Sequence, residues 1–599
     1  LKTLSLIRDT IEIIRQRHKI NIDPDKIPLD DPKTYELFQG GETVGVFQYE
    51  SPGMQKHLRD LKPSAFSDLI AMNALYRPGP MAYIPNYIKR KHGLEPITYD
   101  LEAMNEILEE TYGITVYQEQ VMLLSQRLAN FTRGQADTLR KAMGKKDLNL
   151  LQKLHADFIS GGVSNGHAED ILKKIWNDWI AFANYAFNKS HSTCYAFVAF
   201  QTAYLKANYP AEYMAAVLSN NIGDIKQVTF FMEECKRMNV NVLGPDVNES
   251  QYKFTVNEKG EIRFGLGAIK NMGEAAAGSI LEERISGGKY KSVFDFLVRS
   301  NLRSINKRTV EALATSGAFD SFEGIHRAQF FFKENNENQT FLEKMIRYAG
   351  QAQEAKNSTQ INLFGEAMEI EVSEPAFPQC ERWSKMKELQ EELDSIGFYI
   401  SSHPMDTYKI PIRFFTNANI QYIQNGMQEM QGYKLSFAAQ VTAAEHLMSQ
   451  QGNAYGRFKV EDHNASMELT LFSETYLKVK HLLDPGTFVL IHAIVQPSFR
   501  NKEMMELKVA DIQLLDRVLE QSGKAVVFKI TVDELEETEL NELIALFKSH
   551  LGGKHAYSVQ FIDNELKLIT TLRSGAGKIN ASVLLPLLEK FEFVAFELK

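Results

Sequence analysis

The spacing of the apolar residues changes along the chain, and this change limits the possible fold more than any other feature of the sequence. Within residues 1–250 apolar positions recur at helical intervals, as at Ile171, Ile175 and Trp179. Within residues 431–516 they alternate with polar ones, which is the pattern of half-buried strands. We therefore expect a multidomain α+β protein that begins with a mostly helical domain.

The length of the chain, 599 residues, is enough for several domains of about 100–200 residues each. Five or six short strands in the alternating region indicate a small β-barrel. A final α+β domain is indicated by strand-like segments near 525–530, 558–562 and 591–598, because helical sequence lies between them. We predict five segments: a helical domain at 1–250, a mixed domain at 251–350, a connecting segment at 351–430, the barrel at 431–516 and the last domain at 523–599.

Composition excludes several classes of protein. Hydrophobic residues make up 44% and charged residues 24%, as in folded globular proteins. No apolar run approaches the ~18 residues that span a bilayer, so we expect no membrane association. The three cysteines (Cys194, Cys235 and Cys380) are far apart, which indicates a reducing cytoplasm rather than a disulfide framework. A net charge of -9 excludes a globally basic nucleic-acid binder but allows local basic surfaces.

The first residues form an amphipathic pattern and not a signal peptide. Leu4, Ile7, Ile11 and Ile14 lie at helical spacing, and charged residues separate them. The chain opens at Leu1, without Met, inside this pattern. We therefore expect it to be a piece of a longer protein.

A compact cationic segment lies at residues 133–146, "RGQADTLRKAMGKK". It surrounds the single acid Asp137 with five basic residues: Arg133, Arg140, Lys141, Lys145 and Lys146. Arginine and lysine clamp phosphoryl oxygens, so a triphosphate is a fitting ligand. The alternative is a solvated helix face.

A second candidate anion site lies between two apolar helices, where the segment Asn188-Lys189-Ser190-His191-Ser192 begins the second helix. The free N–H groups of a helix start attract anions, and a lysine and a histidine accompany them. Simple capping by Ser190 or Ser192 is the alternative. The turn Arg77-Pro78-Gly79-Pro80 presents a further arginine.

The stretch "FGLGAIKNMGE" (264–274) looks like a helix-hairpin-helix, in which backbone N–H groups approach a DNA phosphate without reading bases. The candidate contacts are Gly267, Lys270, Asn271 and Gly273; the usual hairpin has glycine where this chain has Asn271. A generic turn is the alternative. Four further cations extend the basic surface, with no acid between residues 296 and 310: Arg299, Arg303, Lys307 and Arg308.

The barrel region combines aromatic and basic residues, which suits stacking on single-stranded bases. Its candidate DNA contacts are Arg457, Lys459 and Arg500. Phe458 and Phe472 are each predicted to be core residues, with a stacking role as the alternative.

Signatures of independent catalysis are missing from the sequence. Asp23-Pro24-Asp25 is the most obvious carboxylate pair, and its proline-rich surroundings predict a turn and a cap. There is no Walker A sequence, HExxH, GxSxG or convincing zinc spacing. We therefore predict neither catalytic nor metal-binding residues within the chain.

Several long motifs resemble one family. They are "LYRPGPM" (75–81), "TYGITVYQEQVM" (111–122), "LRKAMGKK" (139–146), "FNKSHSTCYAFVAFQTAYLKANYPAEYMAAVL" (187–218), "FGLGAIKNMGE" (264–274) and "SGAFD" (316–320). Together they are similar to the C-terminal half of the bacterial replicative DNA polymerase III alpha subunit, a family C DNA polymerase. The resemblance is collinear over nearly the whole chain and weakest in the last domain.

The resemblance implies a role for each segment. Residues 1–250 would be the fingers, and the hairpin region would lead into a clamp-binding segment. Residues 431–516 would be an OB-fold, and 523–599 would bind the tau subunit of the clamp loader. Gln360, Leu363 and Phe364 resemble the Gln-x-x-Leu-Phe peptide that bacterial replication proteins insert into the sliding clamp.

The implied nucleotide site comprises Arg77, Arg140, Lys141, Lys145, Lys146 and the segment Asn188 to His191. The Mg²⁺-binding aspartates of the palm would precede Leu1, so the chain alone should be inactive as a nucleotidyltransferase. Implied partners are dNTP, primer–template DNA, the sliding clamp and tau. The alternatives are a non-catalytic DNA-binding and clamp-tethering adaptor and, less favoured, an error-prone alpha paralogue.

Overall fold

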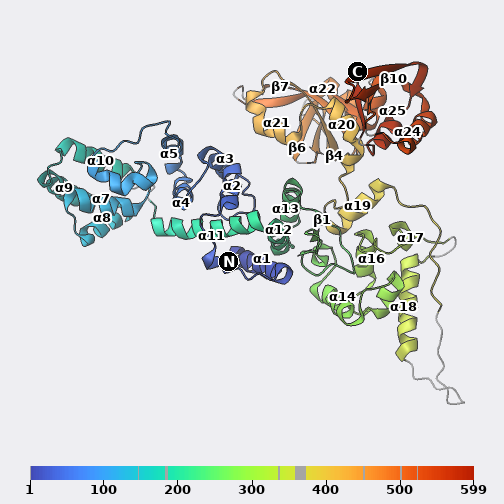
Figure 1. Cartoon of the computed structure of the whole chain (residues 1–599), viewed down its shortest axis with the longest axis horizontal. Coiled ribbons are helices and arrows are strands. Elements are labelled where there is room, and N and C mark those ends of the chain that lie inside the picture. Colours follow the sequence, from blue (N-terminus) through green and yellow to red (C-terminus); the bar gives the residue numbers. More distant parts are fainter. Residues whose placement is uncertain are drawn as a thin grey trace. The chain divides into compact units, whose positions relative to one another are not determined.

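The computed structural model contains two compact units, Leu1–Ser401 and Ser402–Lys599 (Figure 1). It describes residues 2–145, 147–182, 187–334, 338–357, 373–449, 452–463, 465–498, 502, 504–521, 524–533, 535–591 and 593–599. The division between the units falls inside the predicted connecting segment. In this described part of the chain, no helix is both long and apolar enough to cross a membrane.

The first 240 residues are helical, and their helix starts follow local rules. Asp31 and Ser51 cap helices whose first position is proline, and Pro210 opens another. The helices are α1 (Lys2–His18), α2 (Pro32–Gly40), α3 (Pro52–Leu61), α4 (Phe66–Leu75), α5 (Ile84–Lys91), α6 (Asn105–Leu108), α7 (Gln118–Ala129), α8 (Arg133–Lys145), α9 (Leu148–Ser164), α10 (Glu169–Phe182), α11 (Lys189–Asn208), α12 (Pro210–Asn220) and α13 (Ile225–Arg237).

These helices build separate cores. Helices α7 to α10 surround Phe158, Trp176 and Trp179. The long helix α11 lies beside α2 and α4 and buries Phe200 with Phe38 (Figure 1). The described residues of this region confirm the predicted, mostly helical domain.

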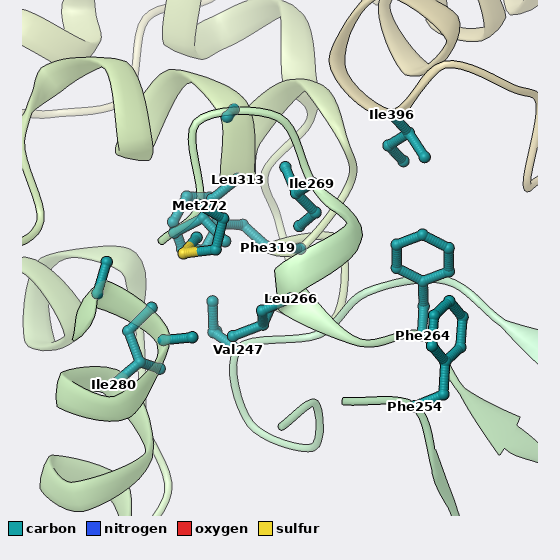
Figure 2. Packing of buried hydrophobic residues seen from close by; sticks show 14 of the residues in the cluster. Val247, Phe254, Phe264, Leu266, Ile269, Met272, Ile280, Leu313, Phe319 and Ile396 are labelled. Atoms are coloured by element: carbon teal, nitrogen blue, oxygen red, sulfur yellow. The ribbon is translucent and has the colours of Figure 1, made fainter. Parts of the chain in front are cut away.

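The hairpin region folds onto a third core. A small sheet of β1 (Val242–Leu243), β3 (Ile262–Arg263) and β2 (Thr255–Val256) leads into the hairpin. Figure 2 shows Met272 beside Leu313 and Leu266 beside Val247, so apolar hairpin residues hold the turn in place. The helices are α14 (Glu274–Gly287), α15 (Val293–Arg299), α16 (Lys307–Thr315), α17 (Arg327–Phe331), α18 (Phe341–Asn357) and α19 (Lys385–Ile396).

The second unit contains two sheets. The barrel sheet has the order β6-β5-β4-β7-β8, and all neighbouring pairs are antiparallel. Its elements are α20 (Lys409–Phe415), α21 (Ile420–Gly426), β4 (Lys434–Met448), β5 (Ala454–Glu461), β6 (Ser466–Phe472), α22 (Ser473–Val479), β7 (Phe488–Pro497), β8 (Met505–Leu514) and α23 (Leu515–Gln521).

The last sheet has the order β11-β10-β9-β12. Its elements are β9 (Val526–Thr531), α24 (Glu537–Ser549), β10 (Leu551–Asp563), β11 (Leu568–Ile579), α25 (Ala581–Leu588) and β12 (Val594–Leu598). Three of the four strands lie where the sequence predicts them, and β11 is additional. The multidomain α+β class is confirmed.

The two barrel phenylalanines differ. Phe458 is 1% exposed and lies in the barrel core, as predicted. Phe472 is 62% exposed, so its predicted core position is wrong. The reason is the alternation of β6: Leu469 and Leu471 point into the core, which turns Phe472 to the outer face.

Candidate nucleotide and nucleic-acid interface

The start of α11 meets the start of α7. Tyr117 and Phe187 form a parallel bridge, and the Gln118 N–H donates to the Phe187 carbonyl at 2.9 Å. Asn188 caps α11 by accepting a hydrogen bond from the His191 N–H at 2.8 Å. The cap is therefore Asn188, and not Ser190 or Ser192.

Two carboxylates bind this helix start. Glu119 accepts hydrogen bonds from the Asn188 side chain (2.6 Å) and from the Lys189 N–H (2.9 Å). Glu110 accepts from the Lys189 ammonium at 2.6 and 2.8 Å. The helix start attracts negative charge, as expected for a helix dipole, and in this structure it meets the protein's own acids. Sequence reasoning did not assign Glu110 and Glu119 to the site, although both lie in or beside the motif at 111–122.

Arg77 and His191 lie at the same place. The Arg77 guanidinium lies 3.9 Å from the centre of the Phe187 ring, and its Nε donates to the Ala74 carbonyl at 2.9 Å. Burial lowers the pKa of Arg77. His191 is exposed and lies between Phe187 and Tyr195, with ring centres 5.4 and 4.4 Å away.

The two serines of this segment separate. Ser190 is exposed at the start of α11, whereas Ser192 is buried and donates to the Ile70 carbonyl at 2.6 Å. Four predicted residues therefore gather around Phe187 and the start of α11: Arg77, Asn188, Lys189 and His191.

The cations of α8 share one acid. Arg140 and Lys141 contact Asp137 at 2.8 and 2.7 Å, and these hydrogen bonds lower the pKa of that carboxyl. Lys145 is exposed at the end of the helix, and Lys146 lies outside the described residues.

The hairpin keeps its backbone form despite the missing glycine. Asn271 has φ 65°, in the left-handed region that asparagine tolerates better than most residues. The Gly267 N–H already donates to the Tyr252 carbonyl at 2.9 Å, and a Cβ there would lie 2.6 Å from the Tyr252 ring. Gly267 therefore has a packing role, which disfavours its predicted phosphate contact. At Gly273 an added Cβ would meet open space.

Lys270 connects the hairpin to α19. Its backbone N–H donates to the Ser395 carbonyl at 2.9 Å and its ammonium to the Asp394 carbonyl at 2.7 Å. The residue is exposed, so its position is fixed at the surface of the domain.

The four cations that follow the hairpin have different environments. Arg299 donates to the side chains of Glu283 (3.0 Å) and Asp295 (3.1 Å) and to three backbone carbonyls. Its guanidinium lies 4.6 Å from the centre of the Tyr290 ring. Burial disfavours its charge, but the carboxylate hydrogen bonds raise the pKa of Arg299 overall. This guanidinium is satisfied inside the domain, which disfavours a DNA contact.

Lys307 is exposed but engaged, because its ammonium donates to Glu343 at 2.7 Å. Hydrogen bonds from Lys307 and from the Thr340 N–H lower the pKa of Glu343 to about 2. Arg303 and Arg308 are exposed, and no ion pair with another described residue involves either side chain.

The barrel presents Arg457 and Lys459 on its outer face. Arg457 lies 3.1 Å from Glu468 and 4.0 Å from Glu445, and all three side chains are about half exposed. Arg500 lies outside the described residues, as do the predicted clamp-binding residues Gln360, Leu363 and Phe364.

The described residues contain no group of three or more His, Cys, Asp or Glu side chains arranged to hold a metal ion. Asp23 caps a short 3-10 helix, Pro24–Lys26, by accepting from the Asp25 N–H, as predicted.

A hairpin module and a barrel that both present exposed cations define a multidomain nucleic-acid-binding protein. Family models support each part. Residues 3–166 match the bacterial DNA polymerase III alpha subunit finger domain, 239–330 match a helix-hairpin-helix motif, and 435–515 match an OB-fold nucleic acid binding domain.

Curated relatives extend the match. The chain is 37% identical to the DNA polymerase III subunit alpha of Thermus aquaticus, over 93% of this chain and 44% of that protein. It is 34% identical to the subunit of Escherichia coli K12, over 92% and 48%, and 37% identical to that of Aquifex aeolicus, over 84% and 41%. The chain belongs to the bacterial DNA polymerase III alpha subunit family, and it spans about half the length of these relatives.

Proposed function

We propose that the chain is the part of a replicative DNA polymerase that holds the triphosphate of the incoming dNTP and grips primer–template DNA. The complete polymerase would transfer a nucleotide from dNTP to the primer 3′-hydroxyl and release pyrophosphate. Mg²⁺ would be held by palm aspartates elsewhere in that protein, and the enzyme would work in the cytoplasm. The similarity to proteins named DNA polymerase III subunit alpha supports this assignment.

The observation that carries the nucleotide assignment is the charge balance on α8. Arg140 and Lys141 share the single carboxylate of Asp137, so the group keeps a net positive charge. The contacts are solvent-exposed, with 61% of the Lys141 side chain accessible, and exposed ion pairs contribute only about 0–1 kcal/mol. A triphosphate can therefore replace Asp137 as the partner at little cost.

The start of α11 supports the same assignment. Its cations and N–H groups already bind two carboxylates, Glu110 and Glu119. These acids would hold Lys189 in place until a phosphate competes for it. Arg77, fixed above Phe187, adds charge that does not depend on either acid.

The test uses a complete alpha subunit that contains these residues. Replacing Arg140 or Lys141 with Ala should raise the KM for dNTP about tenfold or more, because charge-assisted phosphate contacts are lost. DNA affinity should change less than twofold. Lys173→Ala is the matched control, since Lys173 also pairs with an acid on its own helix, Glu169, at 2.6 Å. A loss of DNA affinity with an unchanged dNTP response would assign α8 to DNA instead.

The proposed DNA-binding surface comprises the exposed cations after the hairpin and those of the barrel. Arg303 and Arg308 are available because no acid in the described part of the chain pairs with them, and Gly273 leaves room for a phosphate at the start of α14. Lys270, held at the surface by α19, would add a further charge.

We also propose two protein partners. Gln360, Leu363 and Phe364 would insert into the sliding clamp, and the last domain would bind tau. Replacing the three residues together with Ala should abolish clamp binding and leave DNA binding intact, measured by separate titrations. Unchanged clamp affinity would reject this peptide.

The second candidate function is a non-catalytic DNA-binding and clamp-tethering adaptor. It is favoured by the DNA-binding modules, which need no metal or nucleotide. Specific binding of dNTP by the chain in the presence of primed DNA, reduced by Arg140→Ala, would favour the polymerase. Absence of any nucleotide response would favour the adaptor.

A further inference from the structure

Helix α19 packs against the hairpin although it lies outside the matched motif. The residues that match the helix-hairpin-helix motif end at 330, whereas α19 spans Lys385–Ile396. Ile396 belongs to the same core as Ile269 and Phe264 of the hairpin segment (Figure 2). The support of the hairpin therefore includes a helix from a later part of the chain.

The hairpin turn is bound to the last turn of α19. Lys270 donates its backbone N–H to the Ser395 carbonyl at 2.9 Å and its ammonium to the Asp394 carbonyl at 2.7 Å. Carbonyls in the last turn of a helix lack donors within the helix, so they can accept such bonds. Because the Asp394 carbonyl is neutral, the ammonium keeps its charge and two further N–H donors. Lys270 is thus held in place but can still bind a phosphate, unlike Lys307, whose ammonium pairs with Glu343.

A buried ion pair links α19 to the start of α17. Glu392 is 1% exposed and accepts a hydrogen bond from the Arg327 guanidinium at 2.9 Å, and its second oxygen accepts from the Ser401 N–H at 3.1 Å. Arg327 also donates to Asp320 at 3.0 Å. Burial disfavours the charge of Arg327, but the two carboxylates raise its pKa overall. Removing the Glu392 carboxylate would leave buried donors without an acceptor, so the end of α19 should loosen.

We propose that Glu392 is a positioning residue for DNA binding: together with Arg327 it fixes the end of α19, which holds Lys270 where it meets a DNA phosphate. An exposed lysine has many rotamers, and ordering such a side chain on binding costs free energy. Because α19 orders Lys270 in advance, the phosphate contact forms with less of this cost. The inference rests on the proposed DNA-binding function and extends it to a helix outside the matched motif.

The first experiment is a double-mutant cycle on the binding of primed DNA by the chain. Lys270→Ala should weaken binding about fivefold and flatten the log–log salt slope by about 0.9, because one phosphate contact is lost. Glu392→Ala should weaken binding about threefold when Lys270 is present and have no further effect in the Lys270→Ala background. A purely structural role of Glu392 would weaken binding equally in both backgrounds and leave the salt slope unchanged.

Two controls use the same helix. Glu391→Ala removes the neighbouring glutamate, which forms no ion pair with another described residue, and should bind primed DNA within about twofold of the unmodified chain. Glu392→Gln keeps an oxygen that can accept from the Arg327 guanidinium, so it should recover most of the affinity that Glu392→Ala loses. Thermal unfolding of every variant shows whether it is folded.

A pair of surface variants tests the end of α19 without changing the buried ion pair. Asp394 is exposed, and its replacement by Gly or by Ala removes the same carboxylate. Glycine weakens the last helical turn, whereas alanine keeps it. Asp394→Gly should therefore bind primed DNA about twofold more weakly than Asp394→Ala. This difference should disappear in the Lys270→Ala background.

The outcomes separate the positioning role from the proposed function. If the two Asp394 variants bind DNA equally, or if Glu392→Ala has the same effect in both backgrounds, the positioning role is wrong although DNA binding stands. Normal DNA binding by Lys270→Ala would also reject it, because α19 would then hold a residue that DNA does not contact. If Glu392→Ala does not fold, the Asp394 pair decides. If the unmodified chain does not bind primed DNA, the proposed function itself is wrong.

Discussion

The hairpin domain and the barrel both carry basic residues that the sequence marks as DNA contacts, but they hold them differently. In the hairpin domain Arg299 donates to two carboxylates and three backbone carbonyls, and its side chain is only 16% exposed. In the barrel Arg457 forms ion pairs that are about half exposed on both sides. The same residue type is a structural support in one domain and an available charge in the other.

The difference shows that the partners of a cation, and not its place in a basic stretch, decide what it can bind. Moving the Arg299 guanidinium to a phosphate would leave partly buried carboxylate and carbonyl oxygens without donors, which costs free energy. An exposed pair is exchanged for a phosphate at almost no cost. Arg303 and Arg308 have no ion-pair partner among the described residues, so they can contact a phosphate without breaking an internal interaction.

The largest expected effect is on the stability of the hairpin domain. Arg299→Ala should lower the free energy of unfolding by about 2–3 kcal/mol, because its charge-assisted hydrogen bonds and its packing on the Tyr290 ring are lost. Arg303→Ala should change it by less than ~0.5 kcal/mol. Urea unfolding followed by circular dichroism measures both. Equal effects of the two variants would remove the distinction between structural and available cations.

The two glycines of the hairpin also separate a packing role from a role in DNA binding. Gly267→Ala should destabilise the domain by about 1–3 kcal/mol, since its Cβ would clash with the Tyr252 ring. In Gly273→Ala the added methyl group has open space around it, so the variant should be as stable to unfolding as the unmodified chain. Its affinity for DNA should fall. Thermal unfolding and DNA titration on both variants check this. Loss of stability in Gly273→Ala would show a packing role there too.

Reversing the two available arginines should affect binding and not folding. Arg303→Glu combined with Arg308→Glu should weaken binding of primed DNA about tenfold for all sequences alike, because these contacts are to phosphates. Lys548→Glu, on an exposed position of α24, is a charge-reversal control outside the proposed surface and should have little effect. Retained affinity in the double variant would place the DNA surface elsewhere.

The smallest effect is expected at Lys307. Because the pKa of Glu343 is about 2, this carboxylate stays ionised above that pH and keeps Lys307 occupied through the neutral range. Glu343→Gln should leave Lys307 with only Glu311, 3.7 Å away, as an acidic partner and strengthen DNA binding about twofold. The depressed pKa also means that the pair contributes stability above the ordinary glutamate pKa of 4.5 and loses it as the pH falls towards 2. A titration of Glu343→Gln at pH 7 with no gain in affinity would count against a DNA contact at Lys307.

Regular elements were predictable wherever apolar spacing was clear. Helices predominate in residues 1–250, strands predominate in residues 431–516, and three strands of the last domain lie where the sequence predicts them. Strand β11 was not predicted, because its side chains from Leu568 to Arg573 are all exposed and its sequence includes Gly575 and Gly577. Ile579, at the end of the strand, is buried, but over most of its length the strand lacks the alternating pattern that identifies strands in sequence.

The site residues were predictable by type but not by partner. The sequence showed no acid between residues 296 and 310, yet Glu283 and Asp295 reach Arg299 from outside that window. Glu119 likewise reaches Lys189 from 70 positions earlier in the chain. Such pairings arise when helices from distant parts of the sequence pack together. The spacing of charges within one segment does not predict which helices will pack.

The most direct test of this account is the salt dependence of binding to primed DNA. If exposed cations contact phosphates, log affinity should fall linearly with log salt concentration, with a slope near -0.9 for each neutralised phosphate. The unmodified chain should give a slope of about -3 or steeper, and the Arg303→Glu, Arg308→Glu variant a slope flatter by about 1–2. A slope near zero in the unmodified chain, or the same slope in both proteins, would contradict the account.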